Sequence, residues 1–296
     1  MTKPVIGFVG LGLMGAGIVR RLLASGYTVI GLDIDPEREA QARAFGAATA
    51  ENLAQLAAEA DIVHTCVSTP AAVTEIADGP DGLTGIAEMR TRILVDHSTT
   101  DIPTTRRIAA AIAEKTNLAF IDAPVSGGPA AAEGGTLAIM AGGDADAIAE
   151  VRPVMETVGR FTHMGPVTAG QATKLINQTL VLTNYCVIAE ALRLAEAYGV
   201  DAAKVPHALE TGHAGSNLLP ILFERMIARD WTPLGHARTV LKDLEMLSEA
   251  ARQEHIAMPM SGQALSLFRM LVSHGMSERD GSSVFTLLED SATPRT

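Results

Sequence analysis

The chain has 296 residues, enough for two domains of ordinary size, and 47% of them are hydrophobic while 19% are charged. That balance predicts a folded protein with a buried, mainly aliphatic core and excludes extended disorder. The net charge is −11 and no cluster of Lys and Arg occurs, which argues against a nucleic-acid partner because phosphate contacts need concentrated positive charge.

Short β-branched runs alternate with amphipathic segments in the first half of the chain. The predicted strands are Val5–Val9, Thr28–Asp33, Ile62–Val67, Ile93–Asp96, Ala119–Ala123 and Leu137–Ala141. The predicted helices are Met14–Ser25, Glu37–Phe45, Asn52–Glu59 and Thr104–Glu114. Such alternation is typical of parallel strands joined by crossover helices. Because the strands are apolar throughout, we expect a doubly wound, mostly parallel sheet that helices cover on both faces.

From about Gly165 the pattern is helical only. A long helix is predicted over Ala169–Tyr198, ended by Gly199. Shorter helices are predicted near Ala202–Glu210, Leu218–Arg229, Arg238–Glu254, Ser261–His274 and Ser283–Glu289, followed by a frayed tail at Asp290–Thr296. A boundary near His163–Pro166 therefore separates an α/β domain (1–164) from an all-α domain (165–296).

Nothing in the sequence indicates export or membrane insertion. The first strand begins within about four residues of Met1, which leaves no room for a signal peptide. No window reaches about 18 uninterrupted apolar residues, and the longest apolar helix contains Asn177 and Gln178. We therefore expect a soluble, cytoplasmic protein without a membrane partner. Cys66 and Cys186 lie in apolar runs and are expected to be buried free thiols.

A glycine-rich segment follows the first predicted strand and opens the first predicted helix. It matches G-x-G-x-x-G over Gly10, Leu11, Gly12, Leu13, Met14 and Gly15. In that context the first glycine permits the turn, the second lets a pyrophosphate approach the backbone, and the third lets the helix pack on the strand. The pyrophosphate is favoured at the helix N-terminus. The first domain is thus predicted to be a Rossmann domain.

Asp33 ends the second predicted strand, where a carboxylate would bind the adenosine ribose hydroxyls and repel a 2′-phosphate. We therefore expect NAD as the cofactor, with NADP less favoured, although Arg38 could partly tolerate a phosphate. The alternative interpretation is a solvated turn, Asp33-Ile34-Asp35-Pro36, that caps the next helix.

Four further motifs identify a family resemblance. They are Asp122-Ala123-Pro124-Val125-Ser126-Gly127-Gly128, Leu137-Ala138-Ile139-Met140-Ala141-Gly142-Gly143, the run from Gly165 to Gln178, and Lys242-Asp243-Leu244. With the glycine loop they resemble the β-hydroxyacid dehydrogenase family, which includes 3-hydroxyisobutyrate dehydrogenase and tartronate semialdehyde reductase. The resemblance implies reversible hydride transfer between a 3-hydroxy acid and NAD(P), at an active site in the cleft between a Rossmann and an all-helical domain.

The resemblance also assigns residues to roles. Lys174 is implied as the catalytic residue, and a lysine can serve as acid and base if burial lowers its pKa. Substrate contacts are implied at Ser126, Gly127, Gly128, Asn177, Gln178 and Ser216. Cofactor contacts beyond the glycine loop and Asp33 are implied at Val67, Ser68, Thr99 and Lys242. The Ser-Gly-Gly run suits a carboxylate, because consecutive N–H groups can converge there as an anion nest.

Each assignment has a plainer alternative. Lys174 could be a lysine at the rim of a core helix, and the Ser-Gly-Gly run an ordinary turn before Pro129. Lys242 could form a surface ion pair with Asp243, which could itself contact substrate or only pair. His97 is interpreted as a strand-end residue rather than a base. No metal site is expected, since none of the eight histidines form an i, i+4 pair.

Two departures from the family pattern bear on substrate choice. Gln178 stands where the family often has Asn, an order that some tartronate semialdehyde reductase-like members share. Gly235 stands where a phenylalanine is common, with Leu234 beside it. An imine reductase-like enzyme and a catalytically silent NAD-binding scaffold are the competing functions, and the presence of Lys174 argues against both. Because the helix from Ala169 is apolar around most of its circumference, we also expect a homodimer or homotetramer.

Overall fold

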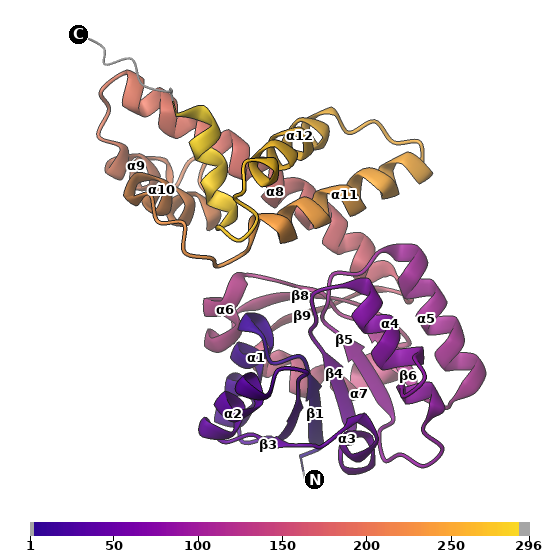
Figure 1. Ribbon diagram of the computed structural model, residues 1–296. Coiled ribbons are helices and arrows are strands. Elements are labelled where there is room, and N and C mark those ends of the chain that lie inside the picture. The colour runs from indigo at the N-terminus through magenta and orange to yellow at the C-terminus, as the bar shows by residue number, and fades with distance from the viewer. Residues whose placement is uncertain (1–2, 290–296) are drawn as a thin grey trace. The chain divides into compact units, whose positions relative to one another are not determined.

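The computed structural model describes residues 3–289, so the predicted frayed tail lies outside the described residues. The chain forms two compact units, residues 1–174 and 175–296, and the division falls within one helix (Figure 1). The predicted domain boundary at 163–166 falls at the end of the last strand and in the turn before that helix.

The first unit is built on one sheet that contains all six predicted strands. The strands are β1 (Val5–Val9), β2 (Thr28–Leu32), β3 (Ala48–Thr49), β4 (Ile62–Thr65), β5 (Ile93–Asp96), β6 (Ala119–Asp122), β7 (Val125–Ser126), β8 (Leu137–Gly142) and β9 (Gly159–Gly165). Their order is β3-β2-β1-β4-β5-β6-β8-β7, with β9 also paired to β8. The first six strands in this order, from β3 through β2, β1, β4 and β5 to β6, are parallel to one another. Strand β8 runs antiparallel to β6 and β7.

Helices cover both faces of this sheet (Figure 1). They are α1 (Leu13–Ala24), α2 (Pro36–Ala44), α3 (Leu53–Glu59), α4 (Pro70–Asp78), α5 (Ile102–Lys115), α6 (Gly128–Gly134) and α7 (Ala145–Val158), with a 3₁₀ turn η1 (Leu83–Gly85). One core contains residues of α1 and α7, and the other contains residues of α3, α4 and α5. The predicted doubly wound, mostly parallel sheet is therefore confirmed.

Some elements of the first unit carry weak sequence signals and were not predicted. Strands β3 and β7 have two residues each, which is too short for a periodic pattern. Strand β9 is largely exposed and polar. Helix α6 is rich in glycine and alanine, and α7 contains Pro153 within it, a residue that normally indicates a helix end.

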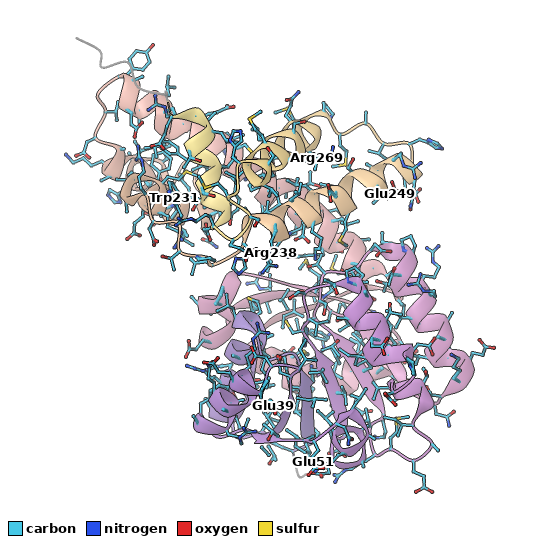
Figure 2. The ribbon with its side chains drawn as sticks, in the orientation of Figure 1. Glu39, Glu51, Trp231, Arg238, Glu249 and Arg269 are labelled. Atoms are coloured by element: carbon cyan, nitrogen blue, oxygen red, sulfur yellow. The ribbon has the colours of Figure 1, made fainter. Side chains whose placement is uncertain are left out.

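The second unit is built from helices, as predicted. They are the main part of α8 (Ala169–Ala197), then η2 (Ala202–Lys204), α9 (Val205–Leu209), α10 (Leu218–Ala228), α11 (Ala237–Gln253), α12 (Pro259–Ser273) and η3 (Gly281–Leu288). Gly199 ends α8 as predicted: its φ is 67°, and the Val200 N–H returns to the Ala195 carbonyl at 2.9 Å. Charged side chains such as Glu249 and Arg269 project from α11 and α12 (Figure 2).

Among the described residues, α8 alone is long and apolar enough to cross a membrane by length and composition. This is weak evidence, because a core helix of a soluble protein passes the same test. Leu182, Ala189 and Leu192 of α8 are buried in the helical core. Cys66 is half-buried and Cys186 buried, both as free thiols, and burial raises the pKa of each to about 12. Neither thiol is therefore a ready nucleophile at neutral pH.

Candidate active site

The glycine loop has the shape that a dinucleotide site requires. Gly10 has a φ of 96°, and a Cβ there would meet the Cys66 carbonyl oxygen at 2.4 Å. A Cβ on Gly15 would lie 1.9 Å from the Gly10 carbonyl oxygen, so α1 packs closely against the turn. Gly12 caps α1, and the nearest atom that a Cβ there would meet is Nη1 of Arg38, at 3.7 Å. The loop therefore leaves room at the N-terminus of α1, where a pyrophosphate fits.

Asp33 is buried behind that loop and holds it. Its carboxylate accepts hydrogen bonds from the Leu11 N–H (2.6 Å) and the Asp35 N–H (2.9 Å). The Arg38 guanidinium lies 3.7 Å from the same carboxylate. Asp35, not Asp33, caps α2 by accepting from the Glu37 N–H. The helix cap of the alternative interpretation is therefore present, but Asp35 forms it. Asp33 remains beside the glycine loop.

The loops after β4 and β5 lie at the same edge of the sheet, because both strands run parallel to β1. Val67 is half-buried and Ser68 exposed at the end of β4, while Thr99 is half-buried after β5. The Val67 N–H donates to the Ser98 hydroxyl at 2.9 Å, which links the two loops. These predicted cofactor residues thus gather beside the glycine loop.

The Ser-Gly-Gly run is the start of a helix and not the ordinary turn of the plainer interpretation. Ser126 ends β7, Gly127 caps α6, and Gly128 is the first residue of α6. Both glycines have positive φ, 134° and 76°. Gly127 is exposed and the other two are half-buried, so this helix start is open to a ligand. A left-handed backbone before a helix is suited to binding an anion.

Lys174 lies in the second turn of α8 and is 7% exposed. Its Nζ donates to the Val125 carbonyl at 2.8 Å, and Val125 immediately precedes Ser126. Lys174 is therefore a buried lysine anchored next to the start of α6, and not a lysine at the rim of a core helix.

Asn177 and Gln178 follow on α8 and belong to the helical unit. The Asn177 amide donates to Gln178 Oε1 at 2.7 Å, and Gln178 Nε2 donates to Asp243 Oδ2 at 2.5 Å. Lys242 Nζ lies 3.1 Å from Asp243 Oδ1. The ion pair with Asp243, the plainer alternative for Lys242, is present, and the predicted cofactor contact of Lys242 stays a prediction. The buried Asp243 joins α8 to α11.

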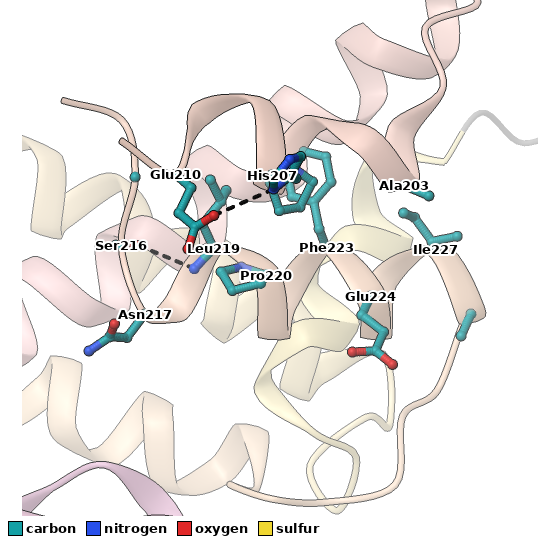
Figure 3. Close-up of a pocket in the computed structure, with 13 residues that line it drawn as sticks. Ala203, His207, Glu210, Ser216, Asn217, Leu219, Pro220, Phe223, Glu224 and Ile227 are labelled. Atoms are coloured by element: carbon teal, nitrogen blue, oxygen red, sulfur yellow. Dashed lines mark hydrogen bonds and ion pairs between the residues drawn. The ribbon is translucent and has the colours of Figure 1, made fainter. Parts of the chain in front are cut away.

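Ser216 lines a hollow of about 920 Å³ formed by α9, α10 and the loop between them (Figure 3). Its hydroxyl accepts from the Leu219 N–H at 3.1 Å, near the start of α10. On one wall of this hollow, the exposed His207 Nδ1 lies 3.5 Å from Glu210 Oε2 (Figure 3). Ser216 therefore has a structural hydrogen bond in addition to its predicted substrate role.

His97 directly follows β5 and is engaged through both ring nitrogens. Nδ1 lies 2.8 Å from the Ala123 carbonyl, and Nε2 lies 2.9 Å from Nδ1 of His64. Burial lowers the pKa of His97 to about 4 and that of His64 well below its usual value. The pair is therefore neutral and structural at pH 7, in agreement with the interpretation of His97. The described residues include no group of three His, Cys, Asp or Glu that could hold a metal ion.

Two family models together match nearly the whole chain. The one described as the NAD binding domain of 6-phosphogluconate dehydrogenase matches residues 5–169. The other, described as NAD-binding of NADP-dependent 3-hydroxyisobutyrate dehydrogenase, matches residues 168–288. The chain belongs to the β-hydroxyacid dehydrogenase family. The predicted resemblance is confirmed, and the protein is an NAD(P)-dependent oxidoreductase.

Relatives of this family match the chain along its length. It is 35% identical over 292 residues to the NAD-dependent L-serine dehydrogenase of Pseudomonas aeruginosa, covering 96% of this chain and 97% of that protein. It is 32% identical over 285 residues to 2-hydroxy-3-oxopropionate reductase of Escherichia coli, covering 96% and 97%. A crystal structure of 3-hydroxyisobutyrate dehydrogenase from Salmonella typhimurium matches with a TM-score of 0.86 at 27% identity, covering 96% and 100%.

Proposed function

We propose that this β-hydroxyacid dehydrogenase transfers a hydride reversibly between a 3-hydroxy acid and NAD, with Lys174 as general acid and base. The observation that carries the proposal is the contact from Lys174 Nζ to the Val125 carbonyl, beside Ser126, Gly127 and Gly128 at the start of α6. A carboxylate bound at Ser126, Gly127 and Gly128 would have its nearby hydroxyl within reach of the lysine amine.

The chain's own residues supply binding and proton transfer. The Gly127 and Gly128 N–H groups and the Ser126 hydroxyl bind the substrate carboxylate. In oxidation, the neutral Lys174 amine takes the proton of the substrate hydroxyl while the carbinol carbon loses its hydrogen as hydride, and a carbonyl forms. In reduction, the Lys174 ammonium returns that proton to the oxygen. The nicotinamide, when bound, accepts or supplies the hydride.

The glycine loop from Gly10 to Gly15, together with Val67, Ser68 and Thr99, holds the dinucleotide. The family resemblance assigns substrate contacts to Asn177, Gln178 and Ser216 and a cofactor contact to Lys242. We favour NAD over NADP, because the Asp33 carboxylate beside the loop would repel a 2′-phosphate. One relative's name includes NAD, and the description of one family model includes NADP.

The experiment that tests this function is a panel of 3-hydroxy acids and their semialdehydes with NAD and NADP, followed by nicotinamide absorbance. We expect turnover of at least one 3-hydroxy acid with NAD. Reduction of imines without oxidation of any hydroxy acid would favour an imine reductase-like enzyme. NADH binding without turnover of any compound would favour a silent scaffold.

Gly235 stands where the family commonly has a phenylalanine, so we expect the substrate's substituent to be larger than a methyl group. Gly235 has no atom within 4 Å of the place where a Cβ would stand, and its φ is not in the left-handed region. Leu234 is 51% exposed and so does not fill that space in this structure. Each buried methylene contributes about 0.8 kcal/mol, or roughly fourfold in kcat/KM.

Longer or branched 3-hydroxy acids should therefore have a higher kcat/KM than 3-hydroxypropionate. Gly235→Phe should reverse this order, because the ring refills the space, whereas Gly235→Ala should leave it in place. The measurement is kcat/KM for a short and a branched acid with each variant. A wild type that prefers the short acid, with an unchanged ranking in Gly235→Phe, would contradict the expectation.

We also propose that the protein is a homodimer or homotetramer of the cytoplasm. Large apolar side chains of α8 remain exposed in the single chain, namely Ile176, Leu180, Val187 and Leu194. At 100° per residue they fall within about 40° of one another, in a stripe roughly 27 Å long. Such a stripe suits the same helix of a second copy.

Light scattering at micromolar concentration should therefore give a mass of at least two chains. Leu180→Asp should lower that mass by placing a charge in the stripe. Ile34→Asp should not, although Ile34 is fully exposed and apolar, because it lies off this helix. A wild-type mass of one chain would exclude the proposed assembly.

A further inference from the structure

Gln171 is a buried amide in the first turn of α8, three residues before Lys174, and it is 1% exposed. Its Oε1 accepts from the Thr100 N–H at 3.1 Å, and its Nε2 donates to the Ser98 carbonyl at 2.8 Å. A peptide carbonyl can only accept and a peptide N–H can only donate, so the orientation of the amide is fixed. Gln171 thus spans both ends of the loop that contains Thr99.

Ser98 extends this connection to the neighbouring loop. Its hydroxyl accepts from the Val67 N–H at 2.9 Å, and its own N–H donates to Asp96 Oδ1 at 3.0 Å. The loops after β4 and β5 are therefore tied to each other and, through one amide, to α8.

The start of α8 is held as firmly on its other side. Asp122, at the end of β6, accepts from the Thr168 N–H and the Gln171 N–H, each at 2.8 Å. Thr168 has a φ of 83°, an unfavourable left-handed conformation for a β-branched residue. A Cβ on Gly170 would lie 2.3 Å from the Asp122 carbonyl oxygen, so the helix begins in direct contact with the strand.

We propose that Gln171 is a positioning residue that sets the Lys174 amine against the loops at Val67–Ser68 and Thr99. The inference rests on the proposed function, in which those loops hold the dinucleotide and Lys174 moves the proton. Lys174 lies one turn beyond Gln171 and is fixed at its far end by the Val125 carbonyl. The Gln171 amide thus connects the loops that would hold the cofactor with the helix that carries Lys174.

Removing the amide should therefore affect catalysis and cofactor binding together. Gln171→Leu keeps most of the volume and deletes both side-chain hydrogen bonds. A shift of about 1 Å between reacting groups can lower a rate roughly 10²-fold, so kcat should fall by about 10- to 10²-fold and KM for NAD should rise severalfold. Thr173→Val is the matched control, because the Thr173 hydroxyl bonds only to the Ala169 carbonyl within α8.

Gln171→Glu separates positioning from packing. A protonated carboxyl can donate to the Ser98 carbonyl and accept from the Thr100 N–H, whereas a carboxylate can only accept. Asp96 and Asp122 disfavour ionisation of this carboxyl, and Lys174 one turn on favours it. We expect the ratio of variant to wild-type kcat/KM for NAD to fall at least tenfold as pH rises through the titration of residue 171. The same ratio for Gln171→Leu should stay low at every pH.

The measurements are initial rates from pH 5 to 9 and NADH binding by fluorescence, with thermal unfolding as the check on folding. A folded Gln171→Leu with wild-type kcat and KM for NAD would overturn the inference, as would a Gln171→Glu ratio that does not change with pH. Should Gln171→Leu not fold, the pH series of Gln171→Glu decides alone. A wild type that binds NADH but turns over no 3-hydroxy acid refutes the proposed function. In that case, weaker NADH binding by Gln171→Leu would still support the positioning role of Gln171. Unchanged NADH binding by Gln171→Leu would refute that role.

Discussion

Lys174→Ala is expected to lower kcat by about 10²–10⁴-fold, the usual contribution of a general acid or base. The side chain is buried and its Nζ donates to the Val125 carbonyl beside Ser126, so the substitution removes the amine from that place. NAD binding should be retained, because the glycine loop is held by its own hydrogen bond from the Leu11 N–H to Asp33, which this substitution leaves in place. The measurement is kcat at saturating substrate, with NADH binding measured in parallel.

Two further variants separate proton transfer from packing. Lys174→Met keeps most of the side-chain length without the amine and should lose as much activity as Lys174→Ala. Small alkyl amines added to Lys174→Ala should restore part of the rate, since they supply the missing acid and base. Lys204→Ala, a change at an exposed lysine of the helical unit, should leave kcat unchanged. Near-normal turnover by Lys174→Met would remove the lysine from the mechanism.

Asp33→Arg is expected to shift the preference from NAD toward NADP by about 10- to 10²-fold in kcat/KM. The substitution removes the carboxylate that repels a 2′-phosphate and adds a charged donor, and a hydrogen bond to a charged group contributes about 1.5–3 kcal/mol. It also releases Arg38, which lies 3.7 Å from that carboxylate and close to Gly12. The measurement is kcat/KM for both cofactors with one substrate.

Asp33→Asn is the control for charge alone. Its amide oxygen can still accept from the Leu11 N–H, so the glycine loop keeps its support while the repulsion is lost. Asp33→Asn should shift the cofactor preference toward NADP less than Asp33→Arg does. Adding Arg38→Ala to Asp33→Asn should cancel that shift. A wild type that already prefers NADP would contradict this interpretation of β2.

Local sequence signals predicted the parts of the fold that depend on local geometry. The glycine spacing specifies the turn before α1, because the positive φ of Gly10 and the close approach at Gly15 exclude a side chain. The end of α8 was predicted for the same reason, because Gly199 adopts the left-handed conformation that ends the helix. The apolar strands indicated a sheet buried on both faces before any contact was known.

The residues that hold the candidate site together could not be predicted in this way. Asp122 and Gln171 are 49 residues apart in sequence, and Gln178 and Asp243 are 65 apart. Periodicity reports which face of an element is buried, but it does not report which polar groups meet across the fold. One signal was available: Asp122 ends an apolar strand, and a carboxylate at such a position needs a partner. Burial raises its pKa to about 6, although the N–H groups of Gln171 and Thr168 lower it.

The proposed function requires that hydride pass directly between the carbinol carbon of a 3-hydroxy acid and the nicotinamide. It is tested most directly with a 3-hydroxy acid deuterated at that carbon, by mass spectrometry of the nicotinamide product. We predict that the deuterium appears in the reduced nicotinamide, and that Lys174→Met makes the same labelled product far more slowly. Release of the deuterium to water, or its absence from the nicotinamide while substrate is consumed, would contradict the proposed function.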